Sequence, residues 1–167
     1  MRHIFFIIPL LLSICCGVDT TPQHNVSIPS YLGRWYEQAR FENWFEKDMD
    51  YVYTDYTADS DKQINVRNFG KTPEGEQKQA KGKAIKVQDG ELAVSFVWPY
   101  WWFRSPYRIL YVNPDYTAAL VSGDGDDYLW LLTRDKCASP RILKKLIKEA
   151  QLRGFDTTKL RFTKQRQ

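Results

Sequence analysis

The chain has 167 residues, which is enough for one domain with a single core and too few for two catalytic lobes. Aromatic residues make up 15% of the chain, a composition that suits strands and apolar pockets better than a helical bundle. The net charge of +4 is a mild excess, with acidic and basic residues interspersed, so we expect a solvated surface and no nucleic-acid partner.

The N-terminal segment has the features of an export signal. Arg2 precedes an apolar run over residues 4–12 that is too short to cross a bilayer. Two adjacent cysteines follow, as in the lipobox where a bacterial signal peptidase cuts before a cysteine that is then acylated. We therefore expect residues 1–15 to be a signal peptide and Cys16 or Cys15 to carry a lipid anchor. An ordinary secretory signal, cleaved after Gly17, is the alternative.

Short apolar runs in the rest of the chain predict an antiparallel meander. Residues 16–30 are rich in polar residues and proline, which predicts a flexible tether, and the folded domain is expected over residues 31–167. In that domain, apolar runs alternate with turn residues such as Asp89-Gly90. They predict eight strands, and then one last short strand, at residues 35–41, 51–59, 63–69, 77–87, 91–98, 107–113, 117–122, 128–134 and 160–163.

One amphipathic helix is predicted near the C-terminus. Ser139 and Pro140 form a helix start signal, Gly154 is placed to end the helix, and an apolar stripe lies between them. Packing of this stripe on the outside of the strands explains it without a second molecule.

Three motifs, in order along the chain, carry a resemblance to a known family. Residues 31–41 contain a Gly-x-Trp motif in the extended form Gly-Arg-Trp-Tyr-Glu. Residues 111–121 look like the family's second motif, a turn between two strands, and residues 128–134 like its third, which ends in arginine. Over residues 31–164 the chain resembles the lipocalins, and among them the bacterial lipocalins and their apolipoprotein D relatives.

The resemblance implies an all-β fold, an eight-stranded antiparallel up-and-down barrel with one C-terminal α-helix packed outside. In lipocalins the three motifs meet at the closed end of the barrel, which implies a structural floor of Gly33, Trp35 and Arg134, with a cation–π pair between the last two. The remaining candidate residues are expected in the ligand cavity and at its mouth, and they are Trp44, Tyr53, Tyr56, Phe69, Phe96, Trp98, Trp101, Trp102, Arg104, Tyr107 and Tyr128.

The expected function follows from the resemblance. It favours binding or transport of a fatty acid such as palmitate, or of a lysophospholipid, with Arg104 or a lysine of the mouth, such as Lys47 or Lys71, near the acidic head. It also implies a protein held in the outer membrane by its lipid anchor, with the domain facing the periplasm. The aromatic residues of the mouth either line the entrance, dock on a membrane, plug the barrel or form a homodimer.

The sequence gives little support for catalysis. His3 and His24 both lie outside the predicted domain, so Ser-His and histidine–metal chemistry lack their usual residue. The acidic loop 123–127 is more typical of a turn than of a metal or acid–base site. We therefore expect no catalytic residue, no metal and no cofactor. A lipocalin-fold enzyme acting on a lipid or isoprenoid, and a structural envelope lipoprotein with a filled barrel, stay as alternatives.

Overall fold

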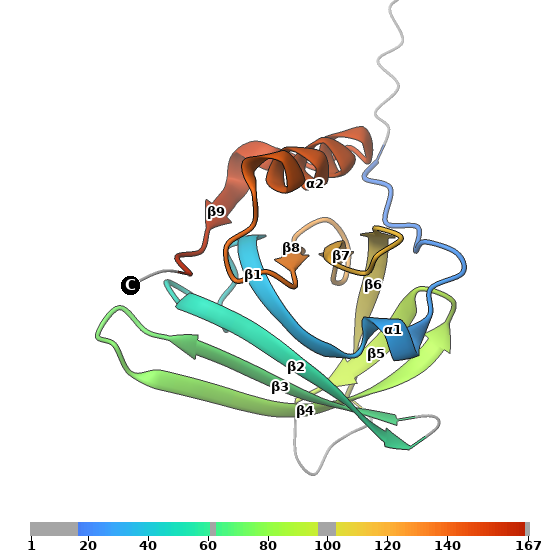
Figure 1. Cartoon of the computed structure of the whole chain (residues 1–167), viewed down its shortest axis with the longest axis horizontal. Coiled ribbons are helices and arrows are strands. Elements are labelled where there is room, and N and C mark those ends of the chain that lie inside the picture. The colour runs from blue at the N-terminus through green and yellow to red at the C-terminus, as the bar shows by residue number, and fades with distance from the viewer. Residues whose placement is uncertain (1–16, 61–62, 97–102, 166–167) are drawn as a thin grey trace, which may run out of the picture.

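Nine antiparallel strands form one continuous sheet in the computed structural model, which describes residues 17–60, 63–96 and 103–165 (Figure 1). The strands are β1 (Gly33–Phe41), β2 (Asp50–Ser60), β3 (Gln63–Lys71), β4 (Gln77–Gln88), β5 (Glu91–Ser95), β6 (Ser105–Val112), β7 (Ala118–Ser122), β8 (Leu129–Thr133) and β9 (Leu160–Phe162). The helices are α1 (Ile28–Tyr31), α2 (Pro140–Leu152) and the short 3-10 helix η1 (Thr157–Lys159). Strands β1 to β8 close into a barrel because β1 pairs with both β2 and β8. The predicted barrel with one external C-terminal helix is therefore confirmed.

Residues with special backbone preferences make the turns between neighbouring strands. Gly90, between β4 and β5, has a φ of 69°, a backbone angle that residues with a Cβ rarely adopt. Between β6 and β7, the side chain of Asn113 accepts hydrogen bonds from the backbone amides of Thr117 and Ala118, both at 2.8 Å. Such turns fix the register, so alternate side chains of each strand face the same side of the wall.

Two hydrophobic clusters lie on opposite faces of the barrel wall, one inside the barrel and one beneath α2. The inner cluster includes Trp35 and Ile109, both 0% exposed. The outer cluster joins the wall to α2 and includes Leu131 and Leu146, which are also 0% exposed. The side chain of Ser139 caps the helix by accepting a backbone amide hydrogen bond, as its sequence position predicted. The helix therefore covers one side of the barrel (Figure 1).

Strand β1 changes its partner halfway along one edge. Its first part pairs with β2, and its end pairs with β9. The tail after β9 continues this seam, because the backbone amide of Tyr51 donates to the carbonyl of Lys164 at 2.7 Å. The side-chain amide of Gln165 donates to the backbone carbonyls of Glu37 and Val52, each at 2.7 Å. The C-terminal tail therefore fills the gap where β1 and β2 separate.

The segment ahead of α1, residues 17–27, lies along the outside of the barrel as an N-terminal strap. The backbone amide of Gln23 donates to the carbonyl of Ile109 in β6 at 2.8 Å. The amide of Val26 donates to the carboxylate of Asp89 at 3.0 Å, and the Val26 side chain is 4% exposed. This differs from the flexible tether expected over residues 16–30, because hydrogen bonds and apolar contacts hold the described part of that segment against the wall.

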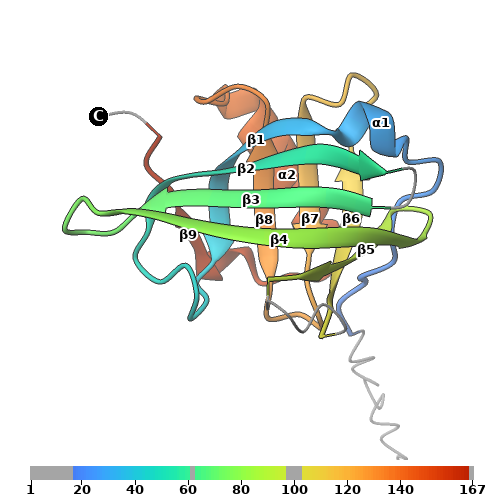
Figure 2. The same cartoon turned by 90° about the horizontal axis from the view of Figure 1, so that it is seen from below.

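The connectivity gives the barrel two different ends. Helix α1 and the β4–β5 and β6–β7 turns lie at one end, the floor, whereas the β1–β2 and β7–β8 loops, the end of β5 and the start of β6 lie at the other end, the mouth. The N-terminal strap runs from α1 toward the mouth end of the molecule (Figure 2). Among the described residues, no helix is both long enough and apolar enough to span a membrane.

Candidate functional site

Trp35 and Arg134 close the floor of the barrel. The guanidinium carbon of Arg134 lies 4.0 Å from the centre of the Trp35 ring. The indole N–H of Trp35 donates to the backbone carbonyl of Tyr31 at 2.8 Å, and Arg134 donates to the carbonyls of Tyr31 and Leu32 at 3.1 and 2.6 Å. Gly33 has a φ of 99°, and a Cβ there would lie 3.0 Å from Arg134 Nη1. The three residues expected at the floor thus meet there, and Trp35 and Arg134 donate hydrogen bonds to its backbone carbonyls.

Three tyrosine hydroxyls meet inside the barrel, above the floor. The hydroxyl of Tyr107 lies 2.7 Å from that of Tyr31 and 2.9 Å from that of Tyr56. Burial raises the pKa of all three hydroxyls, so they stay protonated. Two hydrogen bonds among three hydroxyls use two of the three hydrogens, so this tyrosine triad keeps one donor for a further acceptor.

Inward-facing side chains above the triad line a lumen. Tyr107 faces inward, since it lies opposite the fully buried Leu92 in the β5–β6 ladder. Thr54 and Asn68 face inward on β2 and β3, and their side chains are hydrogen-bonded at 2.9 Å. Tyr107, Thr54 and Asn68 each keep part of their surface accessible, as does Trp130 of β8. These inward-facing side chains therefore form the wall that a ligand inside the barrel would contact.

Phe96 lies on the inner face of the wall beside β4. Gly82 shares this face with Ala84 of the inner cluster, and a Cβ built on Gly82 would lie 2.6 Å from Phe96 Cδ1. The Phe96 side chain is 42% exposed, so it borders the lumen without being enclosed. Gly82 therefore provides the space in which the Phe96 ring lies.

Tyr53 and Phe69 do not line the cavity, contrary to the prediction. Tyr56 faces inward, so alternation along β2 turns Tyr53 to the outer face. There its ring stacks on Phe69 with centres 4.7 Å apart, and the Arg34 guanidinium lies 4.1 Å from its centre. Aromatic residues on this strand pair occupy both faces, so aromatic character alone did not identify the inner one.

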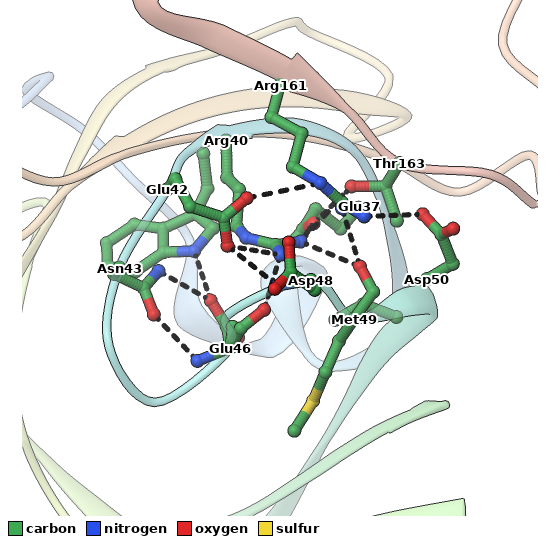
Figure 3. A network of polar contacts seen from close by, with 12 residues as sticks. Glu37, Arg40, Glu42, Asn43, Glu46, Asp48, Met49, Asp50, Arg161 and Thr163 are labelled. Carbon is green, nitrogen blue, oxygen red and sulfur yellow. Dashed lines mark hydrogen bonds and ion pairs between the residues drawn. The ribbon is translucent and has the colours of Figure 1, made fainter. Parts of the chain in front are cut away.

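A buried arginine organises the mouth end of the lumen (Figure 3). Arg40 is 0% exposed and forms ion pairs with Glu37 at 2.6 Å and with Glu42 at 3.0 Å. Its guanidinium also donates to the backbone carbonyls of Glu46 and Met49. These carbonyls lie in the loop between β1 and β2, so Arg40 holds that loop against the barrel.

Glu37 is the most enclosed carboxylate of this network, at 2% exposed. Burial and the nearby carboxylate of Glu46 raise the pKa of Glu37 to about 7, against the opposing effect of Arg40. The hydroxyl of Thr163 in the C-terminal tail donates to Glu37, which ties the tail to the same network. One arginine thus faces more than one carboxylate, and the protonation of Glu37 relieves part of this excess negative charge.

Aromatic rings form a continuous ladder from the mouth into the lumen. The rings of Trp44 and Phe45 meet edge to face with centres 5.5 Å apart, and Phe45 stacks on Tyr128 at 6.1 Å. Tyr128 in turn stacks on Trp130 at 5.9 Å. The Trp130 indole N–H donates to the carboxylate of Glu46 at 3.1 Å, which joins this aromatic ladder to the polar network.

The remaining candidate residues are placed as follows. Arg104 is exposed at the mouth, directly before β6. Five candidates lie outside the described residues, namely Cys15, Cys16, Trp98, Trp101 and Trp102. Within the part of the chain that the structure describes, no group of three or more His, Cys, Asp or Glu side chains is placed to hold a metal ion.

The polar network was missed by the sequence analysis. A β-bulge interrupts the β1–β8 pairing between Glu37 and Ala39, and it brings both Glu37 and Arg40 to the inner side of the strand. Regular alternation assigns these two residues to opposite faces. The available signal was a pair of opposite charges three residues apart within an apolar strand.

Comparisons with known proteins agree with this architecture. The chain is 39% identical to the outer membrane lipoprotein Blc of Vibrio cholerae, over 99% of both chains. It is 33% identical to the outer membrane lipoprotein Blc of Escherichia coli, over 92% of this chain and 90% of that one. Among solved structures, lobster apocrustacyanin A1 aligns with a TM-score of 0.69 at 19% identity, over 92% of this chain and 93% of its own. A family model described as a lipocalin-like domain matches residues 26–165. The chain therefore belongs to the lipocalin family.

Proposed function

We propose that the protein binds one lipid with an acyl chain, a fatty acid such as palmitate or a lysophospholipid, in the lumen of the barrel. The observation that carries the proposal is a barrel sealed at the floor, with inward-facing side chains above it that keep part of their surface accessible. Arg134 and Trp35 close one end, whereas Tyr107 and Trp130 face inward with part of their surface accessible. Burying an acyl chain against such a wall yields about 0.8 kcal/mol for each methylene group.

The polar groups near the mouth support a ligand with a polar head. The acyl chain would lie against the inward-facing side chains that keep accessible surface, such as Tyr107 and Trp130. A head group at the mouth would stay close to water and to Arg104, which is exposed. This orientation avoids burying an ionised head, which would cost several kcal/mol without a partner.

Binding is tested by native mass spectrometry of the protein with added lysophospholipid. We expect a complex of one lipid per chain. Thr54 faces the lumen, so a Thr54→Trp substitution should occupy the ligand volume and weaken binding by at least about tenfold, or about 1.4 kcal/mol. Thr57 is exposed and points outward, so Thr57→Trp is the matched control and should bind as the wild type does. A barrel that takes up no lipid would contradict the proposal.

We further propose that Cys16 or Cys15 is acylated and holds the domain at the outer membrane, facing the periplasm. Support comes from the sequence, where both cysteines follow an apolar run, and from the relatives, which are named outer membrane lipoproteins. Cells fed with a fatty-acid probe should label the wild-type protein. Cys15→Ala, Cys16→Ala and the double variant then identify the acylated residue. A wild-type protein that incorporates no label would rule the anchor out.

A further inference from the structure

The mouth of the barrel exposes large aromatic side chains. Trp44 is 83% exposed in the β1–β2 loop, and Phe103 is 65% exposed two residues before β6. Phe45, beside Trp44, is 40% exposed. Exposed apolar groups gathered at one end of a protein mark an interaction surface more often than isolated ones do. We call these three residues the aromatic rim.

The aromatic rim is continuous with the lumen. Trp44 contacts Phe45, and the ladder then passes through Tyr128 to Trp130, which faces inward. An apolar molecule that leaves the outer surface of the rim therefore meets aromatic rings along its whole way into the barrel. This continuity favours a partner of the rim that can supply an apolar ligand to the lumen.

The start of the described chain lies toward the same end as the rim. The N-terminal strap runs from the floor toward the mouth (Figure 2), and its beginning packs beside the C-terminal end of α2, where Val18 lies 3.7 Å from the position of a Cβ on Gly154. Sixteen further residues precede Gly17, and they contain the apolar run 4–12 and both adjacent cysteines. A lipid attached at those cysteines would bring a bilayer to the end of the barrel that carries the aromatic rim.

The charges around the mouth select among membrane surfaces. Lys47 and Arg104 are exposed there. The β7–β8 loop at the same end carries three exposed carboxylates, at Asp124, Asp126 and Asp127. This mixture offers no net attraction to an anionic surface, so contact with a membrane would depend on the aromatic side chains, which favour the interface of a zwitterionic bilayer.

We infer that the aromatic rim docks on the surface of a phospholipid bilayer, with Trp44 inserted among the head groups and the lumen open toward the membrane. The inference goes beyond the proposed lipid binding and takes the proposed anchor only as a guide to orientation. Docking in this position gives a lipid ligand a route into the barrel that does not cross water.

The test uses the full-length protein, extracted from membranes and reconstituted into phosphatidylcholine vesicles. The emission of Trp44 is obtained as the difference between the wild-type protein and Trp44→Phe. We expect this difference signal to shift to shorter wavelength with vesicles and to be quenched by brominated phosphatidylcholine. A Trp44 signal that acrylamide quenches in the water phase, and that brominated lipid leaves unchanged, would overturn docking.

A tryptophan at the floor serves as the control. Val87 is 59% exposed beside the β4–β5 turn, at the opposite end from the rim. The added emission of Val87→Trp should be quenched by acrylamide and not by brominated lipid. Equal lipid quenching at Trp44 and at position 87 would indicate non-specific adsorption and would also overturn the inference.

Three further measurements distinguish docking on a bilayer from other partners of the rim and from the proposed lipid binding. Docking that requires phosphatidylglycerol and disappears at high salt would contradict contact through the aromatic rim. Cross-linking of two copies through the rim, without lipid quenching, would assign the surface to a homodimer and overturn docking. Lipid stoichiometry is measured on the same samples, so loss of ligand binding with intact quenching counts only against the proposed carrier function.

Discussion

Arg134 lies over the Trp35 ring, with its guanidinium carbon 4.0 Å from the ring centre, and it connects the start of β1 to the end of β8. The same guanidinium donates to backbone carbonyls of Leu32 and Arg34 at 2.6 and 2.8 Å. A second arginine, Arg34, stacks on Tyr53 at 4.1 Å, but its side chain is 45% exposed. The protein therefore offers two arginine–aromatic pairs that differ mainly in burial and in their backbone contacts.

Replacing Arg134 by alanine should destabilise the barrel far more than replacing Arg34. Arg134→Ala leaves several floor carbonyls without a donor, and we expect a loss of about 3 kcal/mol in the free energy of unfolding. Arg34→Ala breaks an exposed ion pair with Asp55 and should cost less than about 1 kcal/mol. Urea unfolding of both variants measures the difference. Similar losses would show that the floor contacts contribute no more than a surface pair.

The tyrosine triad predicts a contrast between two tyrosines of β6. Tyr107→Phe leaves the hydroxyls of Tyr31 and Tyr56 without their shared partner and should cost about 1–3 kcal/mol of unfolding free energy. The hydroxyl of Tyr111 is buried and has no hydrogen-bond partner, so Tyr111→Phe should change stability by less than about 0.5 kcal/mol. Chemical denaturation tests both values, and a neutral Tyr107→Phe would contradict the role of the triad.

Glu37 predicts that stability falls as pH rises through neutrality. Its pKa is raised in the folded protein from 4.5 to about 7, mainly by burial, so between these values the folded chain holds a proton that the unfolded chain has lost. The resulting stabilisation is complete below pH 4.5 and is lost as pH approaches and passes 7. The full change amounts to at most about 3 kcal/mol.

Glu37→Gln removes this titration while keeping the size of the side chain. We expect the variant to show a flatter dependence of unfolding free energy on pH between 5 and 8, roughly the range that the shifted pKa spans. Urea unfolding at several pH values measures the slope. The comparison depends on slopes, so it stands even if the loss of the Arg40 ion pair lowers the stability at every pH. Parallel curves for the two proteins would contradict a raised pKa at Glu37.

Asp89 predicts a pH-dependent release of the N-terminal strap. Its carboxylate accepts the backbone amides of Asn25 and Val26, and these hydrogen bonds lower its pKa below 3.8. This contribution is present above pH 3.8 and is lost as pH falls through the lowered pKa. Asp89→Ala should therefore speed hydrogen exchange at the amides of Asn25 and Val26 at neutral pH.

A matched control for the strap is Asp59→Ala. Asp59 is also an exposed carboxylate with a lowered pKa, but its partners are Lys83 and Asn65, away from the strap. Strap amides should exchange in this variant as they do in the wild type. Equal exchange in all three proteins would show that other contacts, such as the Gln23 hydrogen bond, hold the strap without Asp89.

The barrel and its floor could be predicted from the sequence because local patterns specify them. Gly33 needs a positive φ, the helix start at Ser139 needs a cap, and the turn at Gly90 needs a left-handed residue. Each requirement is met by the residue itself and its immediate neighbours. The stacking of Arg134 on Trp35 followed from the family resemblance, and the structure places the Arg134 guanidinium over the Trp35 ring as that resemblance implied.

The inner surface could be predicted only in part, because it depends on register and on distant segments. Tyr53 and Tyr56 are three residues apart, so alternation puts them on opposite faces of β2, but only the closed barrel shows which of the two faces is the inner one. Glu37 and Arg40 share one face because of a bulge, which has no reliable signal in a single sequence. Thr163 reaches the same network from the far end of the chain, and no local pattern links it to β1.

The seam between β1 and the C-terminal tail determines when the wall can be completed. Strand β1 is among the first parts of the domain to be synthesised, yet its outer edge pairs with β9, and Gln165 bridges the remaining gap to β2. Contacts of such large sequence separation form only after the whole chain is available. A nascent chain therefore leaves this edge of β1 unpaired until β9 and Gln165 have been made.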